Sequence, residues 1–232
     1  MDIKAIVTDI EGTTTKISFV HDVLFPYASK EMAGFVKANA GSESLVPILN
    51  EVKTVAQQMG HPVSSLDDLD EIVALLQQWI EEDKKITPLK TLQGLIWRTG
   101  YAKGDFTGHL YSEVPETLRQ WSQQGIGLYI YSSGSEEAQR LLFQYSDFGD
   151  LSSLLNGYFD TRIGAKREAQ AYERISAEIG VAPNEILFLS DVEEELDAAK
   201  SVGFNTCCLI RETHCGITQH TEAARLDEVS LL

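Results

Sequence analysis

The sequence predicts an α/β protein with a doubly wound parallel sheet, interrupted by an all-helical insertion. Short apolar runs rich in β-branched and aromatic residues recur along the chain, and helical segments separate the later runs. This alternation is typical of a Rossmann-like sheet covered by helices. A long stretch from about Thr15 to His109 breaks the alternation, because it contains several helical patterns and no convincing strand.

The predicted strands and helices of the sheet domain follow from local signals. Four apolar runs read as buried parallel strands: Ile3–Thr8, Ile126–Tyr131, Ile186–Ser190 and Thr206–Ile210. A glycine directly follows each predicted helix, as expected at helix ends; these helices are Pro115–Gln124, Glu168–Ile179 and Glu193–Val202.

The insertion carries its own helical signals. Apolar residues recur at helical spacing over Leu66–Lys85, and another helix is predicted to begin at Thr87 and Pro88. A stretch of roughly 95 residues is too long for a simple crossover between two strands. We therefore predict a core domain of residues 1–14 and 110–232, and a helical cap domain of residues 15–109 over the ligand end of the sheet.

Composition restricts the class of function. The chain has 232 residues and a formal net charge of −16. This charge argues against nucleic-acid binding, which needs clustered Lys and Arg. No apolar run approaches the roughly 20 residues that cross a bilayer, and no signal sequence is evident, so we expect a cytoplasmic protein that does not bind membranes. The three cysteines do not have the spacing of metal ligands, so we expect buried free thiols at Cys207, Cys208 and Cys215.

The most informative motif follows the first predicted strand. Asp9 ends the strand, Glu11 lies two residues on and Gly12 comes next. Side chains at the carboxyl ends of parallel strands point into the ligand crevice. Two carboxylates at such a position indicate a metal site, or a nucleophile paired with an acid/base. A calcium-binding EF-hand loop is excluded, because its glycine and its final glutamate would stand at other positions.

Two other strand ends carry polar residues. Ser132, Ser133 and Gly134 follow the second strand, where hydroxyl groups and a helix start can bind phosphate. The alternative is an ordinary N-cap, with a capping box from Ser133 to Glu136. Asp191 ends the third strand and should lie opposite Asp9, which would suit Mg²⁺. The glutamates that follow Asp191 fit the first turn of a helix.

Lys166 is a weaker candidate. It precedes the helix Glu168–Ile179, and a single lysine is usually a solvated surface charge. Arg162 competes with it as a phosphate partner. Only the other three sites favour a role for Lys166.

Together, these four sites resemble the haloacid dehalogenase superfamily, in which an Asp-x-Asp strand end, a Ser/Thr strand end, a lysine and an acidic strand end surround one phosphoryl group. Glu11 stands where most members carry Asp, and Asp-x-Glu-Gly-Thr-Thr resembles the enolase-phosphatase branch of methionine salvage. Further similar stretches are Ser18–Ala28, Leu92–Gly94 with Ile96–Arg98, and Tyr131–Ser135.

The resemblance implies a mechanism. Asp9 would attack phosphorus, and one Mg²⁺ per chain would be held by Asp9, Asp191 and the backbone carbonyl of Glu11. The Glu11 side chain would serve as acid and then base. The remaining phosphate oxygens would be held by Ser132, Ser133 and Lys166.

The resemblance also implies a preceding reaction, the enolisation of 2,3-diketo-5-methylthiopentyl-1-phosphate, whose enol is then dephosphorylated to an acireductone. His21 and His109 are candidates for the base, although a structural role is an alternative for each. Trp97 and Tyr101 are candidates for an apolar wall around the methylthio group, and a place in a helical core is the alternative for Trp97.

Two rival functions remain open. A phosphatase or phosphomutase of the same superfamily, acting on another small phosphate ester, would keep Asp9 and Asp191 without isomerisation. A non-catalytic protein that binds a divalent cation would lose metal affinity on substitution of Asp9, but has no turnover to lose. In either case the partner is a small molecule or ion, and the resemblance implies a monomer.

Overall fold

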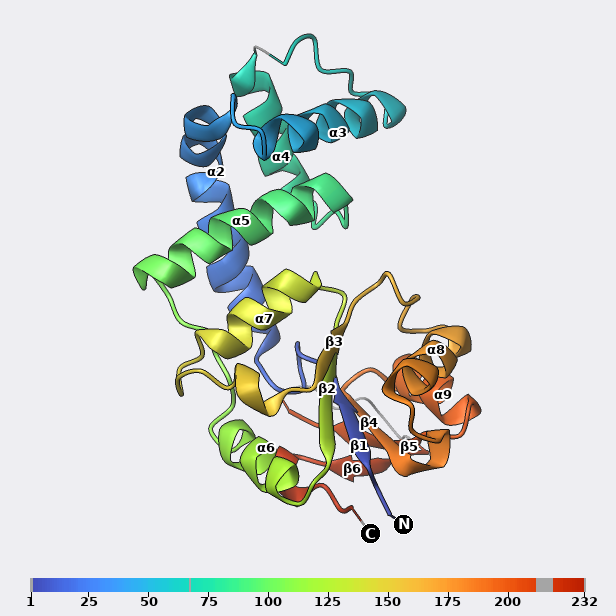
Figure 1. The fold of residues 1–232 in the computed structure, drawn as a ribbon. Helices are drawn as coiled ribbons and strands as arrows, with labels where there is room; N and C mark the ends of the chain where they lie inside the picture. Colours follow the sequence, from blue (N-terminus) through green and yellow to red (C-terminus); the bar gives the residue numbers. More distant parts are fainter. Residues whose placement is uncertain (1, 67, 212–218, 232) are drawn as a thin grey trace. The chain divides into compact units, whose positions relative to one another are not determined.

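The computed structural model describes residues 2–66, 68–211 and 219–231. The chain forms two compact units (Figure 1). The first unit, the core unit, comprises Met1–Phe19 and Thr107–Leu232, and the second, the helical unit, comprises Val20–Phe106. The two units meet in the chain a few residues from the predicted domain boundaries at Thr15 and His109.

The core unit is built on a parallel six-stranded sheet with the order β3-β2-β1-β4-β5-β6. In this sheet Val7 pairs with Tyr129 on one side and with Phe188 on the other. The four predicted strands are confirmed to within two residues at their ends, whereas β3 and β6 were not predicted. The strands are β1 (Ala5–Thr8), β2 (Gly127–Tyr131), β3 (Gly157–Phe159), β4 (Ile186–Ser190), β5 (Asn205–Leu209) and β6 (Thr221–Ala223).

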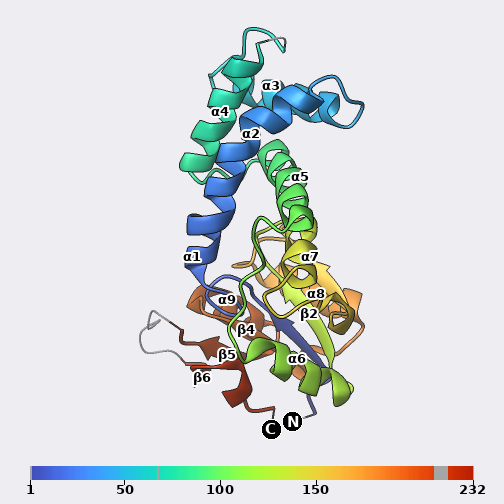
Figure 2. The ribbon, with the colours of Figure 1, turned by 90° about the vertical axis from the view of Figure 1, so that its left-hand side faces the viewer.

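Helices cover both faces of this sheet, with α6 and α7 on one side and α8 and α9 on the other (Figures 1 and 2). The core-unit helices are α1 (Ile17–Phe19), α6 (Val114–Gln123), α7 (Glu136–Gln144), α8 (Ala169–Ile179) and α9 (Glu193–Ser201), with short 3-10 turns at Ser152–Leu154, Pro183–Glu185 and Leu226–Glu228. Because β1 lies between β2 and β4, the chain continues in opposite directions on its two sides. Such a switch point opens a crevice at the carboxyl ends of the strands.

The face under α8 and α9 is packed with large apolar side chains. Tyr172 of α8 lies edge-on to Phe188 of β4, with ring centroids 5.1 Å apart, and Cys208 is part of the same cluster. Cys207 and Cys208 are buried free thiols, as predicted; Cys215 lies outside the described residues. This packing fixes the strand ends that carry the site.

The helical unit begins with the π-helical turn Val20–Leu24 and continues through α2 (Phe25–Asn39), α3 (Leu45–Gln58), α4 (Leu69–Glu81) and α5 (Thr87–Lys103). The helix predicted over Leu66–Lys85 is shorter because the Asp68 side chain accepts a hydrogen bond from the Glu71 amide at 3.0 Å and so caps α4. In the described part of the chain, no helix is both long enough and apolar enough to cross a membrane.

Candidate active site

Strand β1 delivers Asp9 to the crevice. The Asp9 amide donates to the Leu189 carbonyl at 2.9 Å, which continues the pairing with β4 by one residue. The carboxylate is buried, and its Oδ1 atom accepts a hydrogen bond from the Ile10 amide at 2.7 Å. Asp9 is therefore a fixed carboxylate at the centre of the sheet edge.

The loop after Asp9 turns sharply against Asp191. Gly12 has φ +76°, and a Cβ atom placed on it would lie 2.1 Å from Asp191 Oδ2. Only glycine tolerates both this conformation and this approach. The amides of Thr13, Thr14 and Thr15 all donate to the Ile10 carbonyl, which closes the turn. We refer to residues 10–15 as the Asp9 loop.

Lys166 lies at the centre of the site, so the surface-charge interpretation is wrong. Its ammonium nitrogen lies 2.7 Å from Asp9 Oδ1 and 2.6 Å from Glu195 Oε2. Burial alone would lower the pKa of Lys166, but the charges of Asp9 and Glu195 outweigh it and raise the pKa. The Tyr172 hydroxyl donates to the Lys166 carbonyl at 2.6 Å and fixes the backbone there. Lys166 is therefore a permanent cation beside Asp9.

Glu195 is a site residue that local sequence patterns did not identify. It stands in the first turn of α9, where its Oε2 atom accepts a hydrogen bond from Ser190 Oγ at 3.0 Å as well as contacting Lys166. It is the third of three successive glutamates, a pattern that the helix dipole alone would explain. One signal distinguishes the third: only Glu195 is followed by apolar residues both three and four positions on, Ala198 and Ala199, and both of these are buried.

Asp191 follows β4 and faces Asp9, as predicted. Burial, and then the charge of Asp9, raise the pKa of Asp191 to about 6. Its Oδ1 atom is buried and has no hydrogen-bond partner among the described residues. A buried carboxylate oxygen without a donor, close to a second carboxylate, is the arrangement that a divalent cation would stabilise.

The side chains around Asp9 and Asp191 suit a cation that prefers oxygen ligands and takes few of them from the protein. Within residues 2–66, 68–211 and 219–231, no three His, Cys, Asp or Glu side chains come together as a metal site. The carboxylates of Asp9 and Asp191 remain as side-chain donors. Mg²⁺ commonly binds with one or two carboxylates and several waters. The site therefore fits a divalent cation.

The turn after β2 brings Ser132 to Glu11. The Ser132 hydroxyl donates to Glu11 Oε2 at 3.4 Å, and the Gly134 amide donates to Ser132 Oγ at 3.1 Å. Ser133 is the next residue of this turn. The predicted capping box is wrong: the cap of α7 is Ser135, whose Oγ accepts from the Ala138 amide at 3.3 Å. The helix begins later because the chain first turns around the Ser132 hydroxyl.

Arg162 does not share the position of Lys166. Its guanidinium binds Asp160, with Nε 2.9 Å from Oδ1, and Glu136, with Nη2 3.1 Å from Oε2, and its side chain is three-quarters exposed. Asp160 also accepts from the Glu136 amide at 3.3 Å, at the start of α7. Arg162 therefore belongs to an ion-pair network at the end of β3.

The candidates for the enolisation base lie in different units. In the core unit, His109 Nδ1 lies 2.8 Å from Thr15 Oγ1, beside the Asp9 loop. In the helical unit, His21 stands edge-on to Phe25, with ring centroids 5.5 Å apart. Trp97 is buried and its indole N–H donates to the Leu24 carbonyl at 2.8 Å, so its helical-core interpretation accounts for its contacts.

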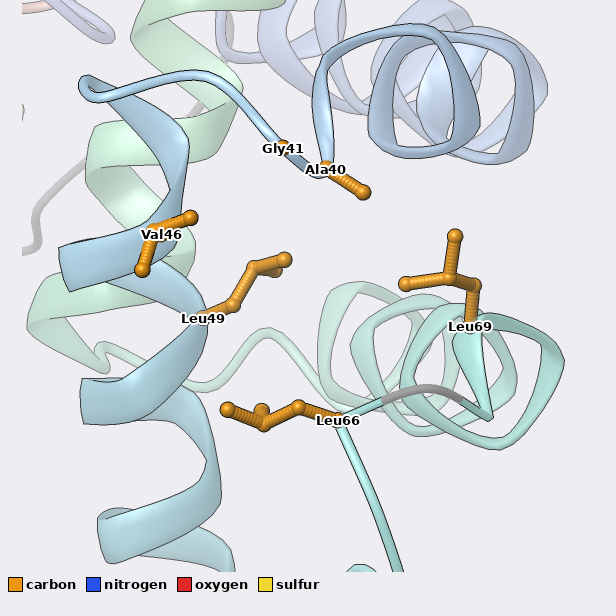
Figure 3. A pocket seen from close by; sticks show the side chains of 6 residues that line it. All are labelled: Ala40, Gly41, Val46, Leu49, Leu66 and Leu69. Carbon is orange, nitrogen blue, oxygen red and sulfur yellow. The ribbon is translucent and has the colours of Figure 1, made fainter.

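The helical unit also contains a cavity of about 380 Å³ between the end of α2, α3 and the start of α4 (Figure 3). The residues that line it carry no polar side chain: Ala40, Gly41, Val46, Leu49, Leu66 and Leu69. Among the described residues, this lining includes no charged or hydroxyl side chain that could bind a phosphate or a metal ion.

Comparison with known proteins identifies the family. Residues 3–203 match the family described as haloacid dehalogenase-like hydrolase. Enolase-phosphatase E1 of Pectobacterium atrosepticum is 51% identical over 99% of this chain and 97% of its own length. The chain belongs to the enolase-phosphatase family of haloacid dehalogenase-like hydrolases. The resemblance predicted from the sequence is thereby confirmed.

Other relatives agree with this enolase-phosphatase assignment. Enolase-phosphatase E1 of Serratia proteamaculans is 50% identical over 99% of this chain. The crystal structure of UTR4 protein from Saccharomyces cerevisiae covers 98% of this chain and all of its own, with a TM-score of 0.79 and 31% identity. CbbY from Rhodobacter sphaeroides, with a TM-score of 0.59 and 14% identity, shares the fold.

Proposed function

We propose that this protein is an acireductone synthase, a bifunctional enolase-phosphatase. It enolises 2,3-diketo-5-methylthiopentyl-1-phosphate and then hydrolyses the phosphate to give 1,2-dihydroxy-3-keto-5-methylthiopentene in methionine salvage. The enolase half is supported by the relatives named enolase-phosphatase over nearly the whole chain. One observation carries the phosphatase half: a buried carboxylate, Asp9, lies against the Lys166 ammonium and opposite Asp191.

Asp9 is the proposed nucleophile. Its carboxylate attacks phosphorus in line, an aspartyl-phosphate bond forms, and the bond to the departing oxygen breaks. Lys166 neutralises negative charge on the phosphoryl group, and the hydroxyls of Ser132 and Ser133 donate to its oxygens. Glu195 keeps the Lys166 ammonium directed toward this position.

Glu11 is the proposed acid/base. Its carboxyl group gives a proton to the departing oxygen, and its carboxylate then takes a proton from the water that cleaves the aspartyl-phosphate. The Ser132 hydroxyl, which donates to Glu11 Oε2, orients this side chain. Glutamate carries one methylene more than aspartate, which provides the reach toward β2.

We propose one Mg²⁺ per chain as cofactor, held by Asp9, Asp191 and the main-chain carbonyl of Glu11. When bound, the ion supplies positive charge that offsets the repulsion between the carboxylates and the phosphate. The fit rests on Asp191, whose buried Oδ1 lacks a donor among the described residues. The substrate is a small phosphorylated molecule.

The helical unit is proposed to serve as a cap domain. It is inserted in the chain between the Asp9 loop and β2, so both of its connections start close in sequence to site residues. A cap that excludes water would protect the aspartyl-phosphate from premature loss. A cytoplasmic location stays a prediction from the sequence, and a monomeric state stays an expectation from the family resemblance.

The decisive experiment is an anaerobic assay with Mg²⁺ and the diketo phosphate, in which phosphate release and ultraviolet absorbance are followed together. We expect an enol absorbance that rises with or before phosphate. Asp9→Asn should abolish phosphate release, because an amide cannot form the aspartyl-phosphate. His21→Ala and His109→Ala, assayed separately, show whether the enol signal requires either histidine.

The alternative is a phosphatase or phosphomutase acting on another small phosphate ester. It predicts phosphate release, or isomerisation of a sugar phosphate, without an enol signal from the diketo compound. That result would keep the Asp9 chemistry and overturn the assignment to methionine salvage.

A further inference from the structure

A buried arginine just beyond β5 binds the Asp9 loop directly. Arg211 Nε and Nη2 both donate to the Thr13 carbonyl, at 3.0 and 2.8 Å. The two residues are 198 positions apart in the sequence, and the Arg211 side chain is only 6% exposed. A buried carbonyl needs a donor, and here both donors come from one planar group.

The other edge of this guanidinium is also fixed. Nη1 lies 2.6 Å from Glu113 Oε1 and 3.0 Å from the Ala224 carbonyl. The central carbon lies 4.1 Å from the centre of the Tyr111 ring, so the ring stacks on one face of the group. With donors on both edges and an aromatic ring on one face, the arginine has little freedom to move.

The acidic partner of Arg211 is itself immobilised. Glu113 is only 5% exposed, and its Oε1 atom also accepts a long hydrogen bond, 3.4 Å, from the Leu226 amide. The same segment reaches the loop a second time, because the Tyr111 amide donates to the Thr14 carbonyl at 3.0 Å. Arg211 thus connects the loop to a rigid part of the core unit.

The position of Thr13 controls the groups that precede it. Glu11 is two residues before Thr13, and between them Gly12 is wedged against Asp191, where added atoms would collide with its carboxylate. The loop has no spare length to absorb a displacement. A shift at Thr13 would therefore move the Glu11 side chain, its main-chain carbonyl, or both.

We propose that Arg211 is a positioning residue for the reaction: it holds the Asp9 loop so that Glu11 reaches its working position. This inference rests on the proposed acid/base role of Glu11. Arg211 touches no reacting atom, and it acts through the Thr13 carbonyl. A buried ion pair with Glu113 that served stability alone would show its effect in unfolding and not in the chemical step.

Arg211→Lys separates the two roles. Lysine can keep the ion pair with Glu113, but it lacks the planar fork that reaches the Thr13 carbonyl at the same time. We expect kcat for phosphate release to fall about ten- to a hundredfold, as small misplacements of catalytic groups do, with KM changed less than about twofold. The limb of the pH–rate profile that reports Glu11 should also shift, because its surroundings change.

Arg225→Ala is the matched control. Arg225 Nη1 lies 3.9 Å from Glu113 Oε2, but its side chain is half-exposed and its other ion pair is with Asp227. This variant removes a cation beside Glu113 without removing a donor from the Thr13 carbonyl. We expect wild-type kcat and an unchanged pH profile.

Hydrogen exchange of the Asp9 loop provides a readout that does not need turnover. In Arg211→Lys, peptides covering Thr13–Thr15 should exchange at least about tenfold faster, while β4 keeps its protection. If the wild-type protein failed to act on the diketo phosphate, the proposed function would fall, yet this measurement would still test the contact. Unchanged exchange, or faster exchange with unchanged kcat, would overturn the positioning role.

Glu113→Gln is the milder variant in case Arg211→Lys does not fold. The amide oxygen still accepts from Arg211 Nη1, but the charge that immobilises the guanidinium is gone. We expect a smaller fall in kcat in the same direction, again without a matching rise in KM. Wild-type kcat in this folded variant, together with wild-type loop exchange, would contradict the proposal.

Discussion

The site gathers three carboxylates around one ammonium group. Asp9 and Glu195 both contact Lys166, and Asp191 lies within range of the Asp9 and Lys166 charges. Without a metal ion, negative charge is in excess inside the protein, where it is poorly screened. Such an arrangement favours the binding of a cation, and it lowers the stability of the folded protein when no cation is bound.

This excess gives a pH-dependent prediction for Asp191→Asn. The pKa of Asp191 is raised to about 6 in the folded protein from an ordinary value of 3.8. Between these values the folded state binds more protons than the unfolded chain, so the Asp191 contribution to stability is lost as the pH rises. In EDTA, the variant should melt about 5 °C higher than wild type at pH 7.5, and the difference should disappear near pH 4.

Asp227→Asn is the control for this comparison. The Asp227 carboxylate is exposed and paired with Arg225, which holds its pKa below the usual range, so its removal should not raise the melting temperature at pH 7.5. Adding Mg²⁺ should stabilise the wild type but not Asp191→Asn. Equal melting curves for wild type and Asp191→Asn in EDTA would contradict the charge argument.

At the scale of elements, helix α7 supports the turn after β2, which we propose binds phosphate, through Gln139. This side chain is fully buried, and its Nε2 donates to the Gly134 carbonyl at 2.9 Å and to the Phe159 carbonyl at 2.8 Å. One amide group therefore joins the turn after β2 to the end of β3. The Ser132 and Ser133 hydroxyls are carried on the turn that it fixes.

Gln139→Leu should loosen this turn. Leucine leaves the Gly134 carbonyl without its donor, which costs about 1–3 kcal/mol of stability. KM for the phosphorylated substrate should rise more than kcat falls, because the proposed role of the displaced groups is to bind phosphate and not to attack it. The control is Gln120→Leu on the exposed face of α6, where the side chain contacts Glu116 at 3.3 Å. An unaltered KM in folded Gln139→Leu would exclude this role.

The strands and helices that could be predicted from the sequence are those whose apolar pattern extends over enough residues to be recognised. The runs that became β1, β2, β4 and β5 are apolar over four or five residues, and their positions follow directly. Strands β3 and β6 have three residues each, too few for a pattern, and their pairing to β2 and β5 defines them. Helix starts shifted where a side chain caps the helix at another residue, as Ser135 does for α7.

The site was predictable where a residue ends a strand. Asp9, Ser132 and Asp191 follow β1, β2 and β4, and parallel strand ends meet at one edge by geometry. Lys166 and Glu195 reach the same point from a loop and a helix turn, and no local pattern tells whether such side chains point inward. Arg211 was missed for the same reason, since its contact with Thr13 depends on the whole sheet.

At the scale of the whole molecule, net charge opposes the proposed substrate. A chain of formal charge −16 repels an approaching phosphate ester at low ionic strength, and salt screens this repulsion. We expect kcat/KM to rise about twofold or more between 10 and 150 mM NaCl at fixed Mg²⁺. A steady decrease with salt would indicate instead that the local cations dominate the approach.

The order of the strands also determines how the polypeptide can acquire its structure during synthesis. Strand β1 leaves the ribosome first, but its partners β2 and β4 begin at Gly127 and Ile186. The nascent chain must therefore hold a short apolar segment unpaired while most of the protein is made. Val20–Phe106 is contiguous, so the helices of this unit need no residue from later in the chain to complete the unit. We expect these helices to form before β1 pairs with β2 and β4.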